Sequence, residues 1–147
     1  AWGVSNLDTD DMQELFAQPD GTHCAANQVL YNVGSRGIEY DLLPLMRQHQ
    51  IPVMAYCPLA QAGRLRRGLL NHPALRQIAG EHHATVPQIL LAFLLAQPGV
   101  LPIPRTGSAQ HAQQNAAAAE IRLSAEELAL LDAAFPKPKR KTRLEIV

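Results

Sequence analysis

Cysteine is scarce in this sequence. The two copies, Cys24 and Cys57, stand far apart and without the close spacing of metal ligands. We therefore expect two free thiols, as is usual in the reducing cytoplasm, and neither a disulfide nor a metal site. The adjacent pair His82-His83 adds no metal site, because neighbouring residues point to different faces of a helix.

Long apolar runs and a surplus of charge are lacking as well. No stretch approaches the roughly 20 apolar residues that span a bilayer, so we expect no membrane partner. Basic and acidic residues number 13 each, which gives no sign of a nucleic-acid partner. The one basic run, Lys137–Arg143, is expected to be a solvated tail. An initiator methionine and a signal peptide are also absent, and a strand at the first residue leads us to expect a missing upstream part.

Short apolar runs alternate with helical patterns along the chain. Apolar runs bounded by turn residues are typical of strands buried in a parallel sheet. They occupy Ala1–Val4, Ala25–Tyr31, Ile51–Tyr56 and Val100–Ile103. Helices are predicted from Asp8 or Thr9 to Gln18, over Tyr40–His49, Pro73–His82, Val86–Ala96 and Gln110–Glu120, and after Ser124, which forms a capping box with Glu127. The order is four strand-helix units, with an extra helix in the third.

Two architectures fit this alternation, which implies parallel strands and right-handed crossovers. A small doubly wound sheet binds its nucleotide through a glycine-rich turn after the first strand, and no G-x-G-x-x-G motif occurs here. A (β/α)8 TIM barrel has eight such units in about 250 residues, whereas this chain has 147 residues. We therefore predict an α/β fold in which residues 1–147 form half of a barrel.

Polar and aromatic residues stand where the predicted strands end, which is where barrel enzymes carry their function. They are Ser5, Asn6, Gln28, Tyr56, Arg105 and Thr106. Each has a structural alternative: a turn before the first helix, a packed amide, a rim aromatic or a solvated loop residue. Together they suit one ligand. Amides and hydroxyls suit a carboxamide, a tyrosine face suits a flat ring, and a cation before a helix suits a phosphate, as a dinucleotide requires.

Four motifs resemble the aldo-keto reductase family, and the resemblance covers essentially the whole chain. They are GVSN at Gly3–Asn6, NQVLYN at Asn27–Asn32, AYCPLAQAG at Ala55–Gly63 and IPRTGS at Ile103–Ser108, followed by Gln114-Asn115. The resemblance aligns the chain with strands five to eight, the C-terminal half of the barrel. It implies an NADP(H)-dependent oxidoreductase that reduces small aldehydes or ketones, such as methylglyoxal, to alcohols by hydride transfer.

The resemblance also implies a role for each candidate site residue. Ser5, Asn6 and Gln28 would hold the nicotinamide carboxamide, and Tyr56 would stack on the ring. Cys57, Leu59 and Gln61 would line the pyrophosphate loop. Arg105 and Thr106 would meet the adenosine 2′-phosphate, and Asn115 would lie near the adenine. His111 and Gln114 would lie on the 2′-phosphate side. The family often has arginine at position 111 and glutamate at position 114. With His111 and Gln114 instead, we expect weaker binding of the 2′-phosphate.

The family's catalytic set is missing from this chain. It comprises Asp, Tyr, Lys and His, all contributed before the GVSN strand, and the only lysines here are Lys137, Lys139 and Lys141. We therefore expect no catalytic residue and no activity of this chain alone. Four strands would leave sheet edges and half of the barrel interior exposed. The expected partner is the missing N-terminal half of the barrel or a second copy.

Two other functions stay open on the sequence. Some members of the fold family are auxiliary subunits that bind NADP with little turnover, so the chain could be a cofactor-sensing module with a protein partner. An isolated half-barrel could also bind nothing.

Overall fold

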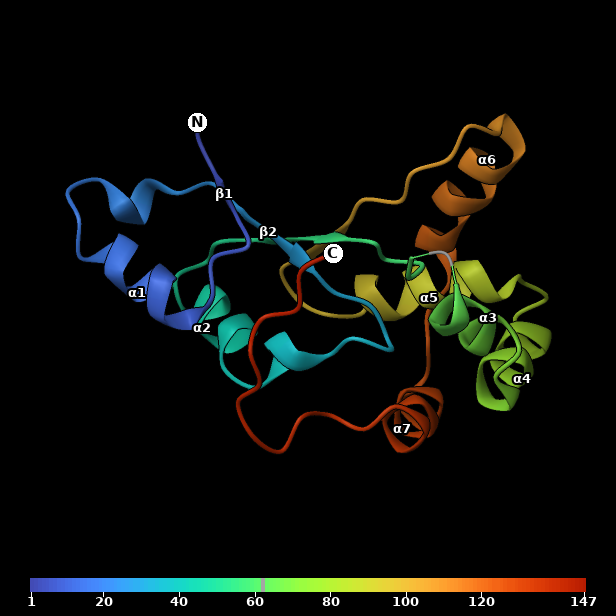
Figure 1. The fold of residues 1–147 in the computed structure, drawn as a ribbon. Coiled ribbons are helices and arrows are strands. Elements are labelled where there is room, and N and C mark those ends of the chain that lie inside the picture. Colours follow the sequence, from blue (N-terminus) through green and yellow to red (C-terminus); the bar gives the residue numbers. More distant parts are fainter. Residues whose placement is uncertain (62) are drawn as a thin grey trace.

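A parallel sheet of four strands lies at the centre of the molecule. The computed structural model describes residues 1–61 and 63–147 (Figure 1); position 62, within the AYCPLAQAG motif, lies outside the described residues. The strands are β1 (Val4–Ser5), β2 (Asn27–Leu30), β3 (Val53–Tyr56) and β4 (Val100–Pro102), and neighbouring strands are parallel. The four predicted strands are confirmed in order, although β1 begins only at Val4.

Helices connect the strands. They are α1 (Thr9–Phe16), α2 (Leu42–Gln48), α3 (Arg64–Leu70), α4 (Pro73–Glu81), α5 (Val86–Leu95), α6 (Ala109–Ala117) and α7 (Ala125–Ala134), with short 3-10 turns at Gly21–His23, Gly37–Glu39 and Ala118–Glu120. All of the predicted helices are present, but α3 is not among the predictions. It contains Gly68, and its N-cap residue Gly63 has no side chain to cap it, so the sequence carries no start signal there.

Capping boxes fix the starts of α1, α5 and α7. In each box the N-cap side chain accepts a hydrogen bond from the third helical residue, whose own side chain accepts one from the N-cap backbone. The pairs are Asp8 with Asp11, Thr85 with Gln88 and Ser124 with Glu127. Of the two possible starts of the first helix, Asp8 is the N-cap, and the predicted capping box of Ser124 with Glu127 is confirmed. Because Asp8 follows Ser5-Asn6 closely, its cap also fixes the exit of the loop that leaves β1.

The two faces of the sheet differ in what covers them. Helices α1, α2, α5 and α7 lie on one side of the strands in Figure 1. The side chains of Val53 and Ala55 are buried, so we assign them to this covered face. Successive side chains of a strand alternate between faces. Gln28, Met54 and Leu101 are partners across neighbouring strands and form one row on the other face, where Leu101 is 51% exposed. We call this second side of the sheet the open face.

The strand order in the sheet is β1-β2-β3-β4, which is also the order of the sequence. A doubly wound sheet instead reverses its order at a switch point, where its nucleotide binds. Right-handed crossovers without a reversal bring successive helices to the same side, as in the wall of a barrel. The doubly wound alternative is therefore wrong, and the chain has an α/β fold with a parallel sheet of the barrel type.

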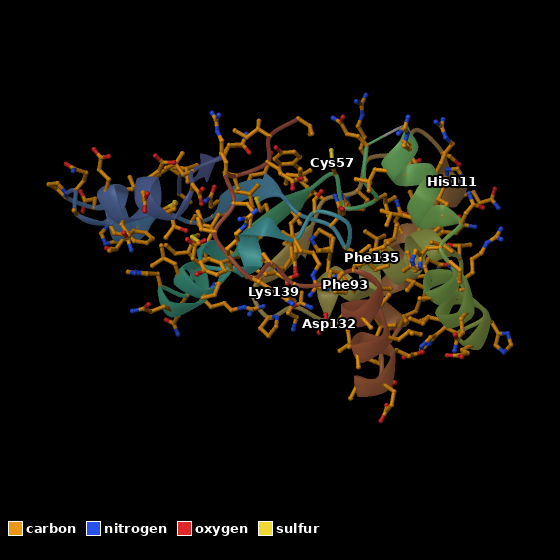
Figure 2. All side chains as sticks on the ribbon, turned by 60° about the horizontal axis from the view of Figure 1, so that its bottom comes forward. Cys57, Phe93, His111, Asp132, Phe135 and Lys139 are labelled. Atoms are coloured by element: carbon orange, nitrogen blue, oxygen red, sulfur yellow. The ribbon has the colours of Figure 1, made fainter. Side chains whose placement is uncertain are left out.

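A buried arginine joins the core to the end of α7. The Arg36 side chain is 4% exposed, pairs with both Glu39 oxygens at 2.7 and 2.8 Å, and pairs with Asp132 at 2.9 Å. It donates to the Phe135 carbonyl and lies over the Phe93 ring, 5.1 Å from its centre. Phe93, Asp132 and Phe135 are close together in Figure 2. Burial alone would lower the pKa of Arg36. The carboxylates of Glu39 and Asp132 outweigh this effect and raise that pKa.

Helix α5 supplies a large part of the core, since residues 89–94 are all buried. None of the helices within residues 1–61 and 63–147 combines the length and the apolar character that crossing a membrane requires. Cys24 is buried and Cys57 is half-buried, and both are free thiols. The expectation of two free cysteines is confirmed.

The C-terminal segment, residues 136–147, runs back to the sheet. Lys141 forms ion pairs with Asp8 and Asp41, and Leu144 packs against the hydrophobic core. The C-terminus accordingly lies beside β2 in Figure 1. The expected solvated run is exposed at every position from Lys137 to Arg143 except Pro138, which is half-buried. Lys141 departs from the expectation, because two acidic side chains far away in the sequence neutralise its charge.

Lys141→Met is expected to lower the free energy of unfolding by about 1 kcal/mol at neutral pH, because it removes a partly buried charge network. Partial burial tends to raise the pKa of Asp8, but hydrogen bonds from Lys141 and the Thr9 N–H outweigh it and lower that pKa. A lowered carboxyl pKa stabilises the fold above about pH 4, and this contribution is lost as the pH falls through the folded-state pKa. The deficit of the variant should therefore shrink in acid.

Urea unfolding of wild type and variant at neutral pH and below about pH 3 measures this difference. Lys139→Met is the matched control, because Lys139 is exposed on the same segment and should change stability little. A deficit of equal size at both pH values would contradict the assignment of the effect to Asp8.

Candidate functional site

Hydrogen bonds bring together polar residues at the ends of β1 and β3 and one residue within β2. The Ser5 hydroxyl at the end of β1 donates to the backbone carbonyl oxygen of Gln28 in β2 at 3.1 Å. The Tyr56 hydroxyl at the end of β3 donates to the Asn6 side-chain oxygen, also at 3.1 Å. We call these four residues the strand-end cluster. Parallel strands bring their carboxyl ends to one edge of the sheet, which is why residues far apart in the sequence meet here.

The loops that leave this edge contain residues with a left-handed backbone. Asn6, Cys57 and Ala60 have φ values of 57°, 49° and 58°. Such conformations are uncommon for residues other than glycine, and they gather at ligand sites because the surrounding structure holds them in place. Asn6 follows β1 directly and Cys57 follows β3 directly, so the backbone bends sharply at the strand-end cluster.

Two buried asparagines hold these loops. The Asn27 amide donates to the Leu7 carbonyl at 2.8 Å, beyond β1. The Asn32 amide donates to the Cys57 carbonyl at 3.1 Å, and its oxygen accepts from the Gly34 N–H at 3.0 Å. Buried amides are retained where their hydrogen bonds fix a backbone. Sequence reasoning missed both asparagines, and the polar residues at the two ends of the apolar NQVLYN run are the signal that could have revealed them.

A second group of predicted residues lines a cleft of about 290 Å³ beside α3, α5 and α6. The lining residues are Leu59, Arg66, Thr85, Pro87, Arg105, Thr106, His111, Gln114 and Asn115. We call this the arginine cleft. Among residues 1–61 and 63–147, no aspartate or glutamate lines it, and no carboxylate forms a salt bridge with Arg66 or Arg105. A cleft with cations and without counterions favours an anionic ligand.

The start of α6 adds to this preference for anions. Ser108 is the N-cap, and its hydroxyl accepts a hydrogen bond from the His111 N–H at 3.3 Å. The Ser108 N–H in turn donates to the Thr106 hydroxyl at 3.1 Å. The first backbone N–H groups of a helix and its dipole favour a phosphate or a carboxylate. Because Arg105 and Thr106 line the cleft next to this helix start, their side chains and the helix end favour the same charge.

The loop between β3 and α3 connects the strand-end cluster to the arginine cleft. Figure 2 shows Cys57 near the middle of the molecule and His111 farther to the right, beside the green helix. Leu59 on this loop lines the cleft, while Gln61 is exposed on the same loop. Arg66, which follows on α3, was not predicted as a site residue, because RLRRGLL contains three arginines and no sequence signal marks one of them.

The three tyrosines differ in their surroundings. Tyr31 is fully buried and donates to Glu39 at 2.7 Å; burial and that carboxylate raise the pKa of its hydroxyl far above the usual range. Tyr40 is 47% exposed, and Tyr56 is already bonded to Asn6.

The histidines likewise assemble no metal centre in the described ranges. No group of three or more His, Cys, Asp or Glu side chains within residues 1–61 and 63–147 could hold a metal ion. His82 instead contacts Glu127 at 2.8 Å and so links the end of α4 to the start of α7.

Comparisons of sequence and structure relate this chain to known proteins. The model of the Aldo/keto reductase family matches residues 1–135. The methylglyoxal reductase YeaE of Escherichia coli is 58% identical over 99% of this chain and 51% of its own length. An aldo-keto reductase from Klebsiella pneumoniae, solved in complex with NADPH, has a TM-score of 0.95 at 61% identity over 99% of this chain and 51% of that one.

A more distant structure agrees. The thermostable aldo-keto reductase Tm1743 has a TM-score of 0.76 at 39% identity over 89% of this chain and 47% of its own. The chain thus spans about half the length of the relatives it matches. The family match over most of its residues shows that this chain belongs to the aldo-keto reductase family.

Proposed function

We propose that this chain is the cofactor-binding, C-terminal half of an NADP(H)-dependent aldo-keto reductase barrel, with β1 to β4 as strands five to eight. The complete enzyme would reduce small aldehydes or ketones, such as methylglyoxal, to alcohols. One observation carries the proposal: the site has a hydrogen-bonding cluster at one end and an arginine cleft without carboxylates at the other, joined by one loop. A dinucleotide has a carboxamide ring at one end, which suits the hydrogen-bonding cluster, and phosphate groups toward the other, which suit the arginine cleft. The Klebsiella relative was solved with NADPH.

The residues of the chain fit the two ends of such a cofactor. Ser5, Asn6 and Gln28 carry the donors and acceptors that a carboxamide needs, and the half-buried Tyr56 ring offers a flat apolar surface. In the cleft, Arg105 supplies a planar fork of donors for a phosphate. The bound nicotinamide would supply the hydride for the carbonyl carbon. The role of this chain is to bind the cofactor and to orient its reactive ring.

The proton for the carbonyl oxygen would come from outside this chain. A tyrosine acid needs a lowered pKa, whereas burial and Glu39 raise that of Tyr31. The open face, with Leu101 half exposed in its row, has the character of a barrel interior that further strands would close. The partner would be the missing N-terminal half or a second copy. The two free thiols suit a cytoplasmic compartment.

Cofactor binding and reassembly test this proposal. Titration of the chain with NADPH, followed by nucleotide fluorescence, should show binding without any oxidation of NADPH by methylglyoxal. Adding the separately purified N-terminal half of the Klebsiella reductase should then produce methylglyoxal-dependent loss of NADPH absorbance. Each half alone is the control. Turnover by this chain alone would contradict the proposed division of roles, and the absence of NADPH binding both alone and in the mixture would refute the proposed function.

A further inference from the structure

Two arginines from separate elements line the arginine cleft. Arg105 follows β4, whereas Arg66 belongs to α3. His111 also lines the cleft, but a histidine is not a permanent cation as an arginine is. Arg66 and Arg105 are therefore the permanent positive charges among the described residues of the cleft.

Arg66 is available to a ligand. Its side chain is exposed, and no salt bridge within residues 1–61 and 63–147 engages it. Its neighbour Arg67 is also exposed on α3 but does not line the cleft, because adjacent residues of a helix point in different directions. The position of Arg66 on its helix, and not the charge of α3 as a whole, therefore brings a cation to the cleft.

We infer that Arg66 binds the 2′-phosphate of the cofactor's adenosine from the α3 side and so sets a preference for NADP(H) over NAD(H). This inference rests on the proposed function. A phosphate monoester carries about 1.5 to 2 negative charges near neutral pH, which suits two arginines that reach it from different walls. Thr106 adds a hydroxyl, while Leu59 and Pro87 offer apolar surface to an adenine ring. Arg66 thus supplies a cation that His111 does not permanently provide.

Binding of two adenosine nucleotides by calorimetry tests this role. Adenosine 2′,5′-bisphosphate carries the 2′-phosphate, whereas adenosine 5′-monophosphate lacks it. Arg66→Met is expected to weaken the bisphosphate at least about tenfold, because it removes charge-assisted hydrogen bonds. The affinity for the monophosphate should stay within about twofold of wild type, since Arg66 would not contact that nucleotide. Arg67→Met removes the same charge from the same helix and should change neither affinity by more than about twofold.

The outcomes separate the two claims. Equal weakening of both nucleotides by R66M, or no weakening of either, would overturn the role of Arg66 while leaving the proposed function intact. An equal effect of R67M on the bisphosphate would also overturn it, because the general charge of α3 would then explain the result. If the wild-type chain bound neither nucleotide, the proposed function and the role of Arg66 would both fail. Selective loss of the bisphosphate in R66M alone supports both.

Discussion

Replacing Arg36 with methionine is expected to lower the free energy of unfolding by about 3–5 kcal/mol, the usual effect of breaking a buried ion pair from one side. The variant leaves the Glu39 carboxylate buried, with the Tyr31 hydroxyl as its one side-chain donor among residues 1–61 and 63–147. It also removes the donor to the Phe135 carbonyl, which ties the end of α7 to the core. Domains are stable by only about 5–15 kcal/mol, so this loss would bring the chain close to unfolding at room temperature.

Urea unfolding followed by circular dichroism measures this effect. Arg76→Met is the matched control, because Arg76 is exposed on α4 and should change stability by less than about 0.5 kcal/mol. Adding Glu39→Gln to R36M should recover part of the lost stability, since burying an amide costs less free energy than burying an unpaired carboxylate. If R36M and R76M were equally stable, the buried network would not support the fold as we describe.

The parts of the fold that the sequence predicts are those set by local interactions. The capping box of Ser124 and Glu127 lies within four residues, so its pattern is visible in the sequence and the structure confirms it. The four strands are likewise found as apolar runs. Arg36 is the opposite case, because its partners Asp132 and Phe135 are almost a hundred positions away. No local pattern distinguishes a buried arginine of this kind from a solvated one.

The same division holds for the candidate site. The residues at the strand ends could be predicted, because parallel strands carry their carboxyl ends to one edge wherever the strands are found. Arg66 could not, because its place in the cleft depends on how α3 packs, and α3 itself lacks a capping signal. The ion pairs of Lys141, outside the candidate site, could not be predicted either, since Asp8 and Asp41 lie far away in the sequence. The sequence therefore indicates the polar residues at strand ends and misses contacts that depend on how distant parts of the chain pack.

The open face raises the question of what it meets in the complete protein. Leu101, Met54 and Gln28 form a row on this face, and Leu101 is 51% exposed. In the barrel that we propose, this row would become part of the filled interior, where layers of side chains from alternate strands pack together. A charge at Leu101 should therefore be harmless in the chain alone and severe in the assembled barrel.

Leu101→Lys is accordingly expected to change the stability of the isolated chain by less than about 0.5 kcal/mol, as for an exposed position. Reassembly with an N-terminal half would bury the new charge without a partner, at a cost of several kcal/mol. At 1.4 kcal/mol per tenfold, a cost of about 4 kcal/mol weakens the complex about a thousandfold. Sedimentation velocity of the mixed halves measures the complex, and methylglyoxal-dependent NADPH oxidation measures its activity. Both should be lost in L101K.

A charge elsewhere on the exposed surface should have no such effect, and this contrast decides whether the open face is a barrel interior. Tyr40→Lys is the matched control: Tyr40 is a large side chain with 47% exposure, and it follows the 3-10 turn at Gly37–Glu39, away from the row on the open face. Y40K should be stable and should reassemble as the wild type does. If L101K reassembled as tightly as Y40K, the open face would not face the second half. If L101K instead unfolded the isolated chain, Leu101 would already be packed there, and the face would not be open.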